Sequence, residues 1–147
     1  MLQLTKIFHF EMAHAIDGYA GACKNIHGHT YELHVTVSAE EEKQDYIPSP
    51  GFIIDFKEIK KIVTEEVVEI FDHKLVLSRD FLTKFSPVFS PENLVILEAE
   101  PTAENILFYI QRLLSAKLPS VVRLSELILF ETKNSYAKWT NTNAINL

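Results

Sequence analysis

Two histidines separated by a single glycine are the residues of this sequence best suited to bind a metal. In an extended backbone the side chains at i and i+2 point the same way, so His27 and His29 present their imidazoles to one point, while Gly28 leaves the path between them open. His14 ends an earlier strand-like segment, and pairing of the two segments would bring it beside the other two. Three imidazoles suit Zn²⁺ and leave one coordination position for water or substrate. The sequence therefore predicts a zinc site of the catalytic type.

Cys23 is the single cysteine of the chain and lies four residues before His27. It cannot form an internal disulfide, and its sulfur is close enough to approach a metal held by the histidines. One interpretation makes it a fourth ligand that closes a structural Cys-His₃ site. The other makes it an acid, base or nucleophile beside an open site, which the glycines of the same loop favour. Both interpretations stay open on these residues alone.

Carboxylates accompany other candidate positions. Asp72 directly precedes His73, and a carboxylate beside an imidazole can orient it and raise its basicity, although such a pair is also common at a polar helix end. Glu131 ends an apolar segment, where either a salt bridge or a ligand contact would account for it. His9 and His34 fall on strand-like segments at other spacings, and we expect them to be solvated or hydrogen-bonded.

Alternating and helical patterns indicate the elements that position these residues. Apolar and polar residues alternate in 2–14, 29–39 and 121–131, which predicts strands there, and 93–99 is expected to be a further strand. Residues 51–56 are expected to form a short strand that feeds a helix. Apolar residues recur at spacings of three and four in 57–71, which predicts an amphipathic helix. A second helix is predicted to follow the capping residue Thr102 and to run to about Lys117.

Length and composition restrict the class of protein. A chain of 147 residues fits a single domain, 1–147, and 47% hydrophobic residues are enough for a packed core. The net charge of −6, without a basic block, argues against a nucleic-acid partner. No apolar run approaches the roughly 18 residues of a membrane span, so we expect a cytoplasmic protein.

These elements predict an α+β fold in which two helices cover one face of a mostly antiparallel sheet. The opposite face, if apolar, would require a partner subunit.

Six motifs follow one another along nearly the whole chain. They are Phe10-Glu11-Met12-Ala13-His14, Cys23-Lys24-Asn25-Ile26-His27-Gly28-His29, Gly51-Phe52-Ile53-Ile54-Asp55-Phe56, Asp72-His73, Pro101-Thr102-Ala103-Glu104-Asn105 and Glu131-Thr132. In these motifs the chain resembles the family of 6-pyruvoyltetrahydropterin synthase and 6-carboxytetrahydropterin synthase. The resemblance implies that the three histidines bind zinc, that Cys23 is the catalytic base and that Asp72 and His73 complete its proton relay.

The same resemblance implies a pterin pocket. Glu131 would hold the pterin, because adjacent N–H donors of a 2-amino-4-oxopterin can bind the two oxygens of a carboxylate side by side. Thr102 and Glu104 match a motif that lines this pocket in such proteins, although Thr102 can equally serve only as a helix cap.

The spacing between the cysteine and the His-Gly-His motif suggests a branch of the family. Three intervening residues resemble the 6-carboxytetrahydropterin synthases of queuosine biosynthesis, whereas the pyruvoyl-forming enzymes typically carry a longer insert. Cysteine rather than glutamate at position 23 argues against the variant that makes a folate precursor. The implied reaction converts 7,8-dihydroneopterin triphosphate to 6-carboxy-5,6,7,8-tetrahydropterin with release of acetaldehyde and triphosphate. The alternatives are 6-pyruvoyltetrahydropterin synthase and a non-catalytic structural zinc module.

The resemblance also implies an architecture and an assembly. Such domains have the tunnelling fold, with a four-stranded antiparallel sheet, and form trimers whose sheets close into a barrel. Two trimers stack into a homohexamer with active sites at subunit boundaries, so Asp72 and His73 can serve a site whose zinc belongs to a neighbour. Two departures from the family pattern are the absence of a Leu-Asn pair after Asp72-His73 and the unfamiliar tail 139–147.

Overall fold

A long antiparallel hairpin forms the centre of the sheet in the computed structural model, which describes residues 1–41, 43–86 and 91–142. Strands β1 (Gln3–His14) and β2 (His27–Ala39) pair from Gln3 opposite Ser38 to His14 opposite His27. Both predicted strands are confirmed. β2 begins two residues earlier than expected, at His27, because this residue still pairs with the last residue of β1.

Four further strands extend this hairpin into a six-stranded sheet with the order β4-β3-β1-β2-β5-β6. On one side β5 (Val122–Thr132) pairs antiparallel with β2, and β6 (Ser135–Thr140) pairs antiparallel with β5. On the other side β3 (Lys74–Ser78) runs parallel to β1, and β4 (Leu94–Leu97) runs parallel to β3. The sheet is therefore mixed.

The prediction of a four-stranded antiparallel sheet is wrong. A parallel pair needs a crossover, and the chain between β3 and β4 provides one that contains the short helix α3 (Arg79–Phe85). The strands that this crossover joins are short apolar runs without alternation, a pattern typical of parallel strands. β6 includes Trp139 and Thr140, the first two residues of the tail that matched no familiar motif, whereas residues 143–147 lie outside the described residues.

The first predicted helix is confirmed as a continuous helical segment. It consists of α1 (Phe56–Val63), a π-helical turn η2 (Thr64–Val68) and α2 (Glu69–Phe71), and its buried residues recur every four positions at Ile59, Val63, Val67 and Phe71.

The strand predicted for residues 51–56 is wrong, because the helix begins within that segment. The Asp55 side chain accepts a hydrogen bond of 2.8 Å from the backbone N–H of Lys57, and this cap starts the helix at Phe56.

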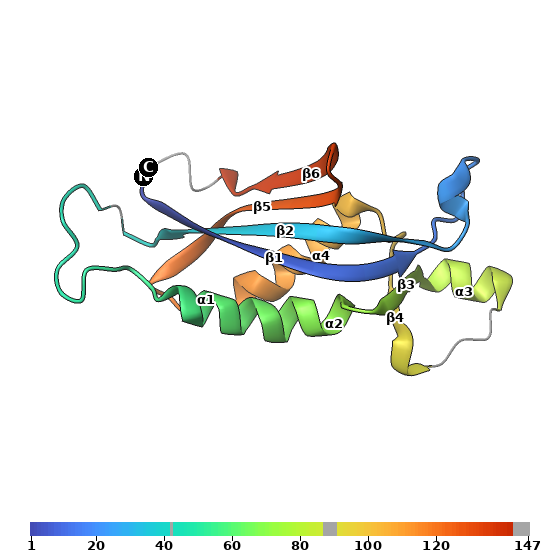
Figure 1. Ribbon diagram of the computed structural model, residues 1–147, viewed down its shortest axis with the longest axis horizontal. Helices are drawn as coiled ribbons and strands as arrows, with labels where there is room; N and C mark the ends of the chain where they lie inside the picture. Colours follow the sequence, from blue (N-terminus) through green and yellow to red (C-terminus); the bar gives the residue numbers. More distant parts are fainter. Residues whose placement is uncertain (42, 87–90, 143–147) are drawn as a thin grey trace.

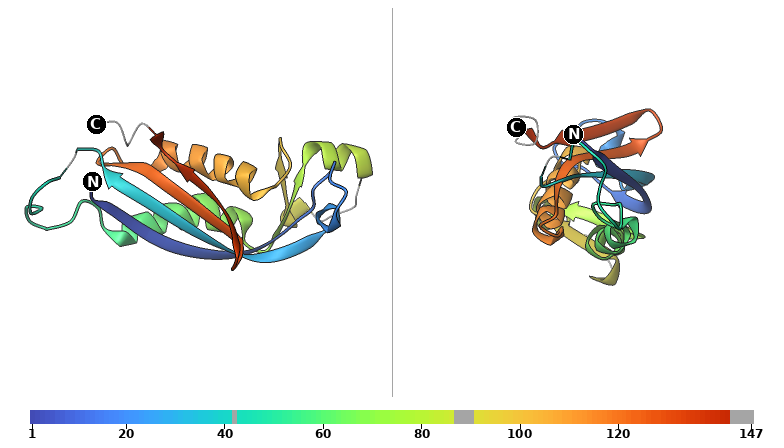
Figure 2. Two further views of the ribbon diagram at one scale, coloured as in Figure 1. Left: turned by 90° about the horizontal axis from the view of Figure 1, so that it is seen from above. Right: turned by 90° about the vertical axis from the view of Figure 1, so that its left-hand side faces the viewer.

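The second predicted helix, α4 (Ala103–Lys117), is also confirmed. The Thr102 hydroxyl accepts a hydrogen bond of 3.3 Å from Asn105 N–H, which satisfies one of the free amides at the helix start. The helical segment α1–α2 and α4 lie on the same face of the curved sheet (Figures 1 and 2), and between them they enclose the hydrophobic core. Two single-turn 3₁₀ helices, η1 (Ala22–Lys24) and η3 (Pro91–Asn93), lie in the connections.

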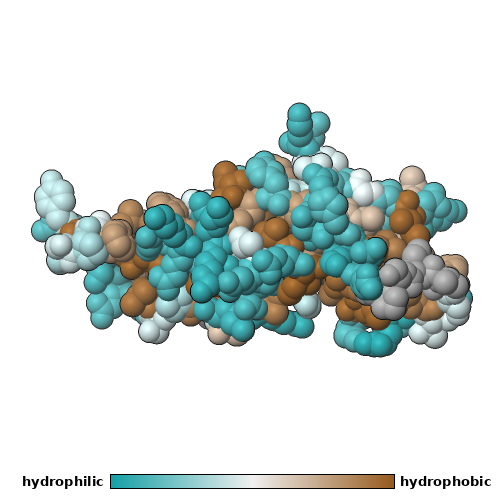
Figure 3. Space-filling model, turned by 60° about the horizontal axis from the view of Figure 1, so that its bottom comes forward, coloured by the Kyte–Doolittle hydropathy of each residue, from teal (hydrophilic) through white to brown (hydrophobic). Residues whose placement is uncertain are grey.

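The helix-bearing side presents mainly hydrophilic residues to solvent (Figure 3). Hydrophobic residues reach the surface toward the end of the molecule that carries α3 and β4, where Phe85 and Ile96 are exposed. Within the described ranges, no helix is both long enough and apolar enough to cross a membrane.

The outer face of the sheet, away from the helices, carries the alternate residues of each strand. Here Glu32 accepts a hydrogen bond from His9 at 3.0 Å and another from His34 at 2.6 Å. The expectation that these two histidines are solvated or hydrogen-bonded is therefore confirmed.

Candidate metal centre

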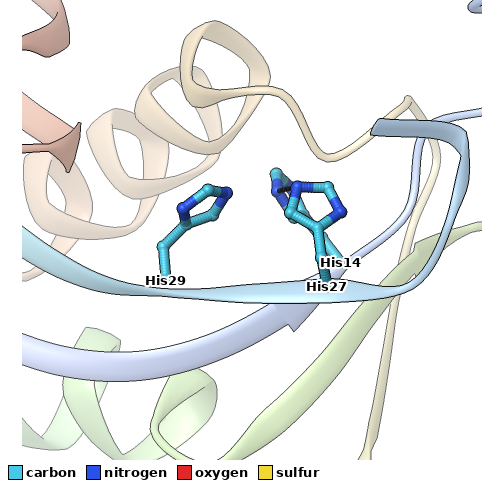
Figure 4. A group of neighbouring side chains, drawn as sticks. All are labelled: His14, His27 and His29. Atoms are coloured by element: carbon cyan, nitrogen blue, oxygen red, sulfur yellow. Dashed lines mark hydrogen bonds between the residues drawn. The ribbon is translucent and has the colours of Figure 1, made fainter. Parts of the chain in front are cut away.

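The three predicted ligands come together at the end of the central hairpin, on the face that also carries the core. His14 is 1% exposed and lies opposite His27, the last pair of the β1–β2 ladder, while His29 follows on the same face of β2. Their imidazoles point toward one common space (Figure 4). Among the described residues, these three side chains form a group whose ligand atoms all lie within 4.8 Å of one another.

Backbone carbonyl groups determine which ring nitrogen of two histidines is available. A carbonyl oxygen can only accept, so His14 Nδ1 donates to the oxygen of Pro101 at 2.7 Å, and His27 Nδ1 donates to that of Asn25 at 2.7 Å. The Nε2 atoms of the two rings then face each other with lone pairs, 3.2 Å apart. Two nitrogens that bind one Zn²⁺ at about 2.0–2.1 Å in tetrahedral geometry would have a similar separation.

The third histidine also presents a free nitrogen. Nε2 of His29 is buried and has no hydrogen-bond partner among the described residues, and the nearest carboxylate oxygen, Glu131 Oε1, is 3.5 Å away. Buried polar atoms are rarely left without a partner, so a bound cation would account for this one. These three nitrogens therefore fit a divalent metal such as Zn²⁺.

The protonation equilibria favour metal binding as well. Burial is the largest cause that lowers the pKa of both His14 and His29 below the ordinary value of 6.5, and the neighbouring imidazoles lower it further. Glu131 opposes this shift in both residues, and the hydrogen bond to the Pro101 carbonyl opposes it in His14. Neutral imidazole is the form that binds a metal.

Gly28 differs from its predicted role. A Cβ atom at this position would lie on the outer face, only 3.3 Å from the backbone oxygen of Met12 and 3.7 Å from Ala13 Cα. The glycine therefore permits the close approach of β1 and β2, and it does not open a path between the two histidines.

Cys23 lies in η1, within the loop that connects β1 to β2. The loop folds back on itself through a 2.9 Å hydrogen bond from Ile16 N–H to the Cys23 carbonyl, and the cysteine is partly buried. Its sulfur is not part of the group of ligand atoms that the described residues bring within 4.8 Å. This arrangement favours the open site over the closed Cys-His₃ site.

Tyr31 is a residue of this site that the sequence reasoning missed. It is fully buried, two positions after His29 on the same face of β2, and its hydroxyl lies 3.4 Å from His14 Nε2. Burial raises the pKa of Tyr31 above its ordinary value of 10, and the charges of Glu131 and Cys23 act in the same direction. The alternation of β2, which places this side chain with the histidines, was the available signal.

Three predicted residues share one pocket of about 290 Å³ beside the histidines. Thr102 and Glu104 line it from the start of α4, and Glu131 lines it from the end of β5. The other lining residues are Ile16, Ala103, Ser135, Tyr136 and Ala137. Thr102 also caps α4, so its sequence-based role as a cap is confirmed whether or not it contacts a ligand.

Asp72 and His73 lie elsewhere. Asp72 accepts a 2.9 Å hydrogen bond from the backbone N–H of Glu11 and contacts His73 Nδ1 at 3.0 Å. The hydrogen bond from Glu11 is the largest cause of the lowered pKa of Asp72, with a smaller contribution from His73. The side chain of His73 is 78% exposed. Its backbone has a positive φ of 59°, and its N–H donates a hydrogen bond to Glu11 O at 2.6 Å, which holds this backbone conformation.

The pair therefore contacts the outer side of β1. His73 lines a pocket of about 510 Å³ that is bordered by the outer-face residues Glu11, Ala13 and Thr30 and also by Met12 and His29. Among the described residues, no hydrogen bond or ion pair joins Asp72 or His73 to the histidine group. Within a single chain, the candidate ligands His14, His27 and His29 point toward the core side, whereas His73 is exposed beside the outer-face residues of β1.

The chain matches the family model of 6-pyruvoyl tetrahydropterin synthase over residues 3–142. The chain belongs to this family.

Curated relatives within and around this family carry pterin-related names. A 6-carboxy-5,6,7,8-tetrahydropterin synthase of Rickettsia typhi is 30% identical over 142 residues, which cover 94% of this chain and 99% of that protein. The enzyme of the same name from Haemophilus influenzae is 38% identical over 76 residues, so the matched part spans about half, 52%, of each protein. A dihydroneopterin monophosphate aldolase of Pyrococcus furiosus is 31% identical over 83% of this chain and 82% of its own length.

Solved structures share the fold. An uncharacterized protein of Wolinella succinogenes superposes with a TM-score of 0.75 at 20% identity, covering 95% of this chain and 98% of that one. The 6-pyruvoyl tetrahydropterin synthase of Caenorhabditis elegans gives a TM-score of 0.68 at 20% identity, covering 96% of both chains.

Proposed function

We propose that the chain is a zinc-dependent carbon–carbon lyase that converts 7,8-dihydroneopterin triphosphate and one water molecule to 6-carboxy-5,6,7,8-tetrahydropterin, with release of acetaldehyde and triphosphate. The observation that carries this proposal is the group of three histidine nitrogens next to a pocket lined by Glu131. One of these nitrogens, Nε2 of His29, is buried and has no hydrogen-bond partner among the described residues. The names of the Rickettsia typhi and Haemophilus influenzae relatives support the choice of reaction.

The three histidines would hold the metal through Nε2 of His14 and His27 and the unpartnered Nε2 of His29. Bound Zn²⁺ would supply Lewis acidity to the hydroxyl groups of the substrate side chain. The carbonyl groups of Pro101 and Asn25 keep two of the rings in the required tautomer and orientation.

Proton transfer is the proposed role of Cys23. A thiolate can remove a proton from the substrate side chain, and the partly buried sulfur lies in the loop next to the histidines. Asp72 would fix and polarise the imidazole of His73 through their 3.0 Å contact, so that His73 can return protons to the departing fragment. Because this pair contacts the outer face of the sheet, we propose that it serves the site of a neighbouring subunit.

Substrate recognition is the proposed role of the small pocket. The Glu131 carboxylate can accept two adjacent N–H groups of the pterin ring, and its position 3.5 Å from His29 would bring the ring next to the metal. Glu104 would line the same pocket from the first turn of α4.

Product analysis tests the reaction. We expect the purified, zinc-loaded protein to release acetaldehyde and triphosphate in equal amounts from 7,8-dihydroneopterin triphosphate, measured by coupled aldehyde reduction and by phosphate chromatography. A Cys23→Ala variant is expected to keep its zinc and to lose turnover by about 10²-fold or more, since general base catalysis contributes about that much. Loss of zinc from this variant would instead support a structural Cys-His₃ module.

A second candidate reaction is the pyruvoyl-forming one, which the name of the family model favours. It would release triphosphate without acetaldehyde. Cleavage of a monophosphorylated dihydroneopterin, the activity named for the Pyrococcus furiosus relative, would be recognised by turnover of that substrate in preference to the triphosphate.

We further propose that the protein acts in the cytoplasm, in queuosine biosynthesis, as a homo-oligomer. A trimer or a hexamer would bring the outer-face pocket with His73 against a neighbouring chain, and would thereby complete each active site at a subunit boundary.

A further inference from the structure

The loop 15–26, which carries Cys23, has little hydrophobic packing to hold it in place. Ala15 is buried in a small cluster beside α3, but all of residues 16–26 are partly or fully exposed. Within the loop, the hydrogen bond of 2.9 Å from Ile16 N–H to the Cys23 carbonyl joins the two arms. Segments with few buried apolar contacts open easily, so the position of the cysteine depends on the polar contacts of the loop with the rest of the chain.

Glu100 holds the loop at the residue next to that hydrogen bond. Oε2 of its partly buried carboxylate accepts a hydrogen bond of 2.8 Å from Asp17 N–H, and Oε1 accepts one from the hydroxyl of Ser78, the residue that caps α3. Hydrogen bonds to a charged group are stronger than those between neutral groups. A second contact, from Lys84 Nζ to the Asp17 carboxylate at 2.9 Å, is a surface ion pair of a kind that contributes little.

The same short segment also orients a candidate metal ligand. Pro101 follows Glu100 directly and supplies the carbonyl to which His14 Nδ1 donates at 2.7 Å. The backbone oxygen of Glu100 is itself fixed, because it accepts hydrogen bonds from Thr102 N–H at 2.8 Å and from Asn105 Nδ2 at 2.9 Å. Two neighbouring residues therefore hold the loop through a side chain and the histidine through a backbone carbonyl.

We propose that Glu100 is a positioning residue, which holds the Cys23 thiol in place relative to the three histidines. This inference rests on the proposed function, in which Cys23 removes a proton from a substrate beside the metal. Glu100 is not among the residues that line the small pocket with Glu131, so it acts through the loop and not by contact with the substrate. Without it the thiol leaves the distance that proton transfer requires, while the pocket for the pterin stays intact.

The reactivity of the thiol tests the contact without any substrate. The chain has a single cysteine, so a thiol reagent reports on this loop alone. Purified wild-type protein and a Glu100→Ala variant are treated with an aromatic disulfide that releases a coloured thiolate. We expect the variant to react about tenfold faster or more, because the loss of a hydrogen bond to a charged group raises the population of the open loop by this factor.

Glu98→Ala is the matched control. It removes the same charge two positions earlier, from a carboxylate that is 76% exposed and pairs with Arg79 on the surface. It should react with the thiol reagent at the wild-type rate.

Turnover separates positioning from support of the fold. With zinc-loaded protein and 7,8-dihydroneopterin triphosphate, Glu100→Ala is expected to lower kcat about tenfold or more and to leave KM unchanged, because a displaced catalytic group slows the reaction without weakening binding at Glu131. A residue that only supports the fold would lower the melting temperature and leave kcat as it is. If the alanine variant does not fold, Glu100→Gln, which keeps the size and one accepting oxygen, takes its place with smaller changes in the same direction.

A thiol rate or a kcat equal to that of the wild type in a folded Glu100 variant would overturn the positioning role and leave the proposed function standing. Equal effects in Glu98→Ala would overturn it as well, because they would trace the changes to the lost charge. A wild-type protein without turnover of dihydroneopterin triphosphate would overturn the proposed function, whereas the thiol rates would still decide whether Glu100 holds the loop.

Discussion

His14 and His29 of the candidate metal centre are shielded from solvent, and the free-energy cost of charging them there makes the stability of the fold depend on pH. Burial lowers the pKa of His14 and His29 in the folded protein, whereas in the unfolded chain both titrate near 6.5. Below about pH 6.5 the unfolded chain therefore takes up protons that the folded chain resists, and the free energy of unfolding decreases. Above this pH both imidazoles are neutral in the folded and the unfolded chain, and their protonation no longer lowers the free energy of unfolding.

We therefore expect the melting temperature of the metal-free protein, prepared with a chelator, to fall as the pH is lowered from 7.5 to 5.5. A His14→Gln variant should show a smaller fall, because one of the two responsible groups is absent. A His9→Gln variant, which changes an exposed histidine on the outer face, should follow the wild type. The explanation would be wrong if all three proteins showed the same pH dependence in calorimetry.

The grouping of the three histidines could be predicted from the sequence because the i, i+2 rule for strands fixes the faces of neighbouring side chains. The same rule places Tyr31 with His27 and His29, but an apolar strand gives no reason to single out a tyrosine. The orientation of His14 was equally hidden, because it depends on the hydrogen bond from its Nδ1 to the Pro101 carbonyl. A contact between residues 87 positions apart cannot be read from local spacing.

Thr102 stands at the start of α4, next to a residue that contacts His14. Its hydroxyl caps the helix at Asn105, and its neighbour Pro101 supplies the carbonyl that orients His14. The start of α4 is thus coupled to the orientation of His14, one of the three candidate metal ligands.

We expect Thr102→Ala to lower the free energy of unfolding by about 1 kcal/mol, the usual value of such a cap, while Thr102→Ser stays close to the wild type. Urea denaturation followed by circular dichroism measures this difference. Unchanged stability of the alanine variant combined with weaker pterin binding would mean that the hydroxyl serves the ligand and not the helix.

The elements that the sequence predicted well are those with a clear period. The alternation of β1 and β2 and the three-and-four spacing of the 57–71 and 103–117 segments each match one regular structure. Residues 51–56 did not behave as a strand, because the capping carboxylate of Asp55 starts a helix there. The parallel strands β3 and β4 have five and four residues, too few for a period to predict their partners.

At the scale of the whole molecule, the site is divided between the two faces of the sheet. The histidines and Tyr31 face the core, whereas Asp72 and His73 contact the outer side of β1. In the proposed function, one chain offers two incomplete parts of the active site, which two neighbouring chains combine.

Mixing of inactive variants tests this arrangement. Cys23→Ala and His73→Ala are each expected to be nearly inactive, and co-expression of the two should restore up to about a quarter of wild-type activity, because random assembly gives that share of sites one intact residue from each neighbour. Co-expression of Cys23→Ala with Cys23→Ser is the control and should restore nothing. If mixed oligomers form and show no gain, both residues act within one chain.

The position of His14 opposite His27 as the last pair of the central hairpin has one more consequence. A metal bound there would cross-link the two strands at the point where the loop 15–26 connects them. Removal of the ion should let this end fray while the opposite end of the ladder stays closed. Amide hydrogen exchange would then accelerate first at residues 12–14 and 27–29. The thiol of Cys23, in the adjoining loop, would become accessible to thiol reagents at the same time.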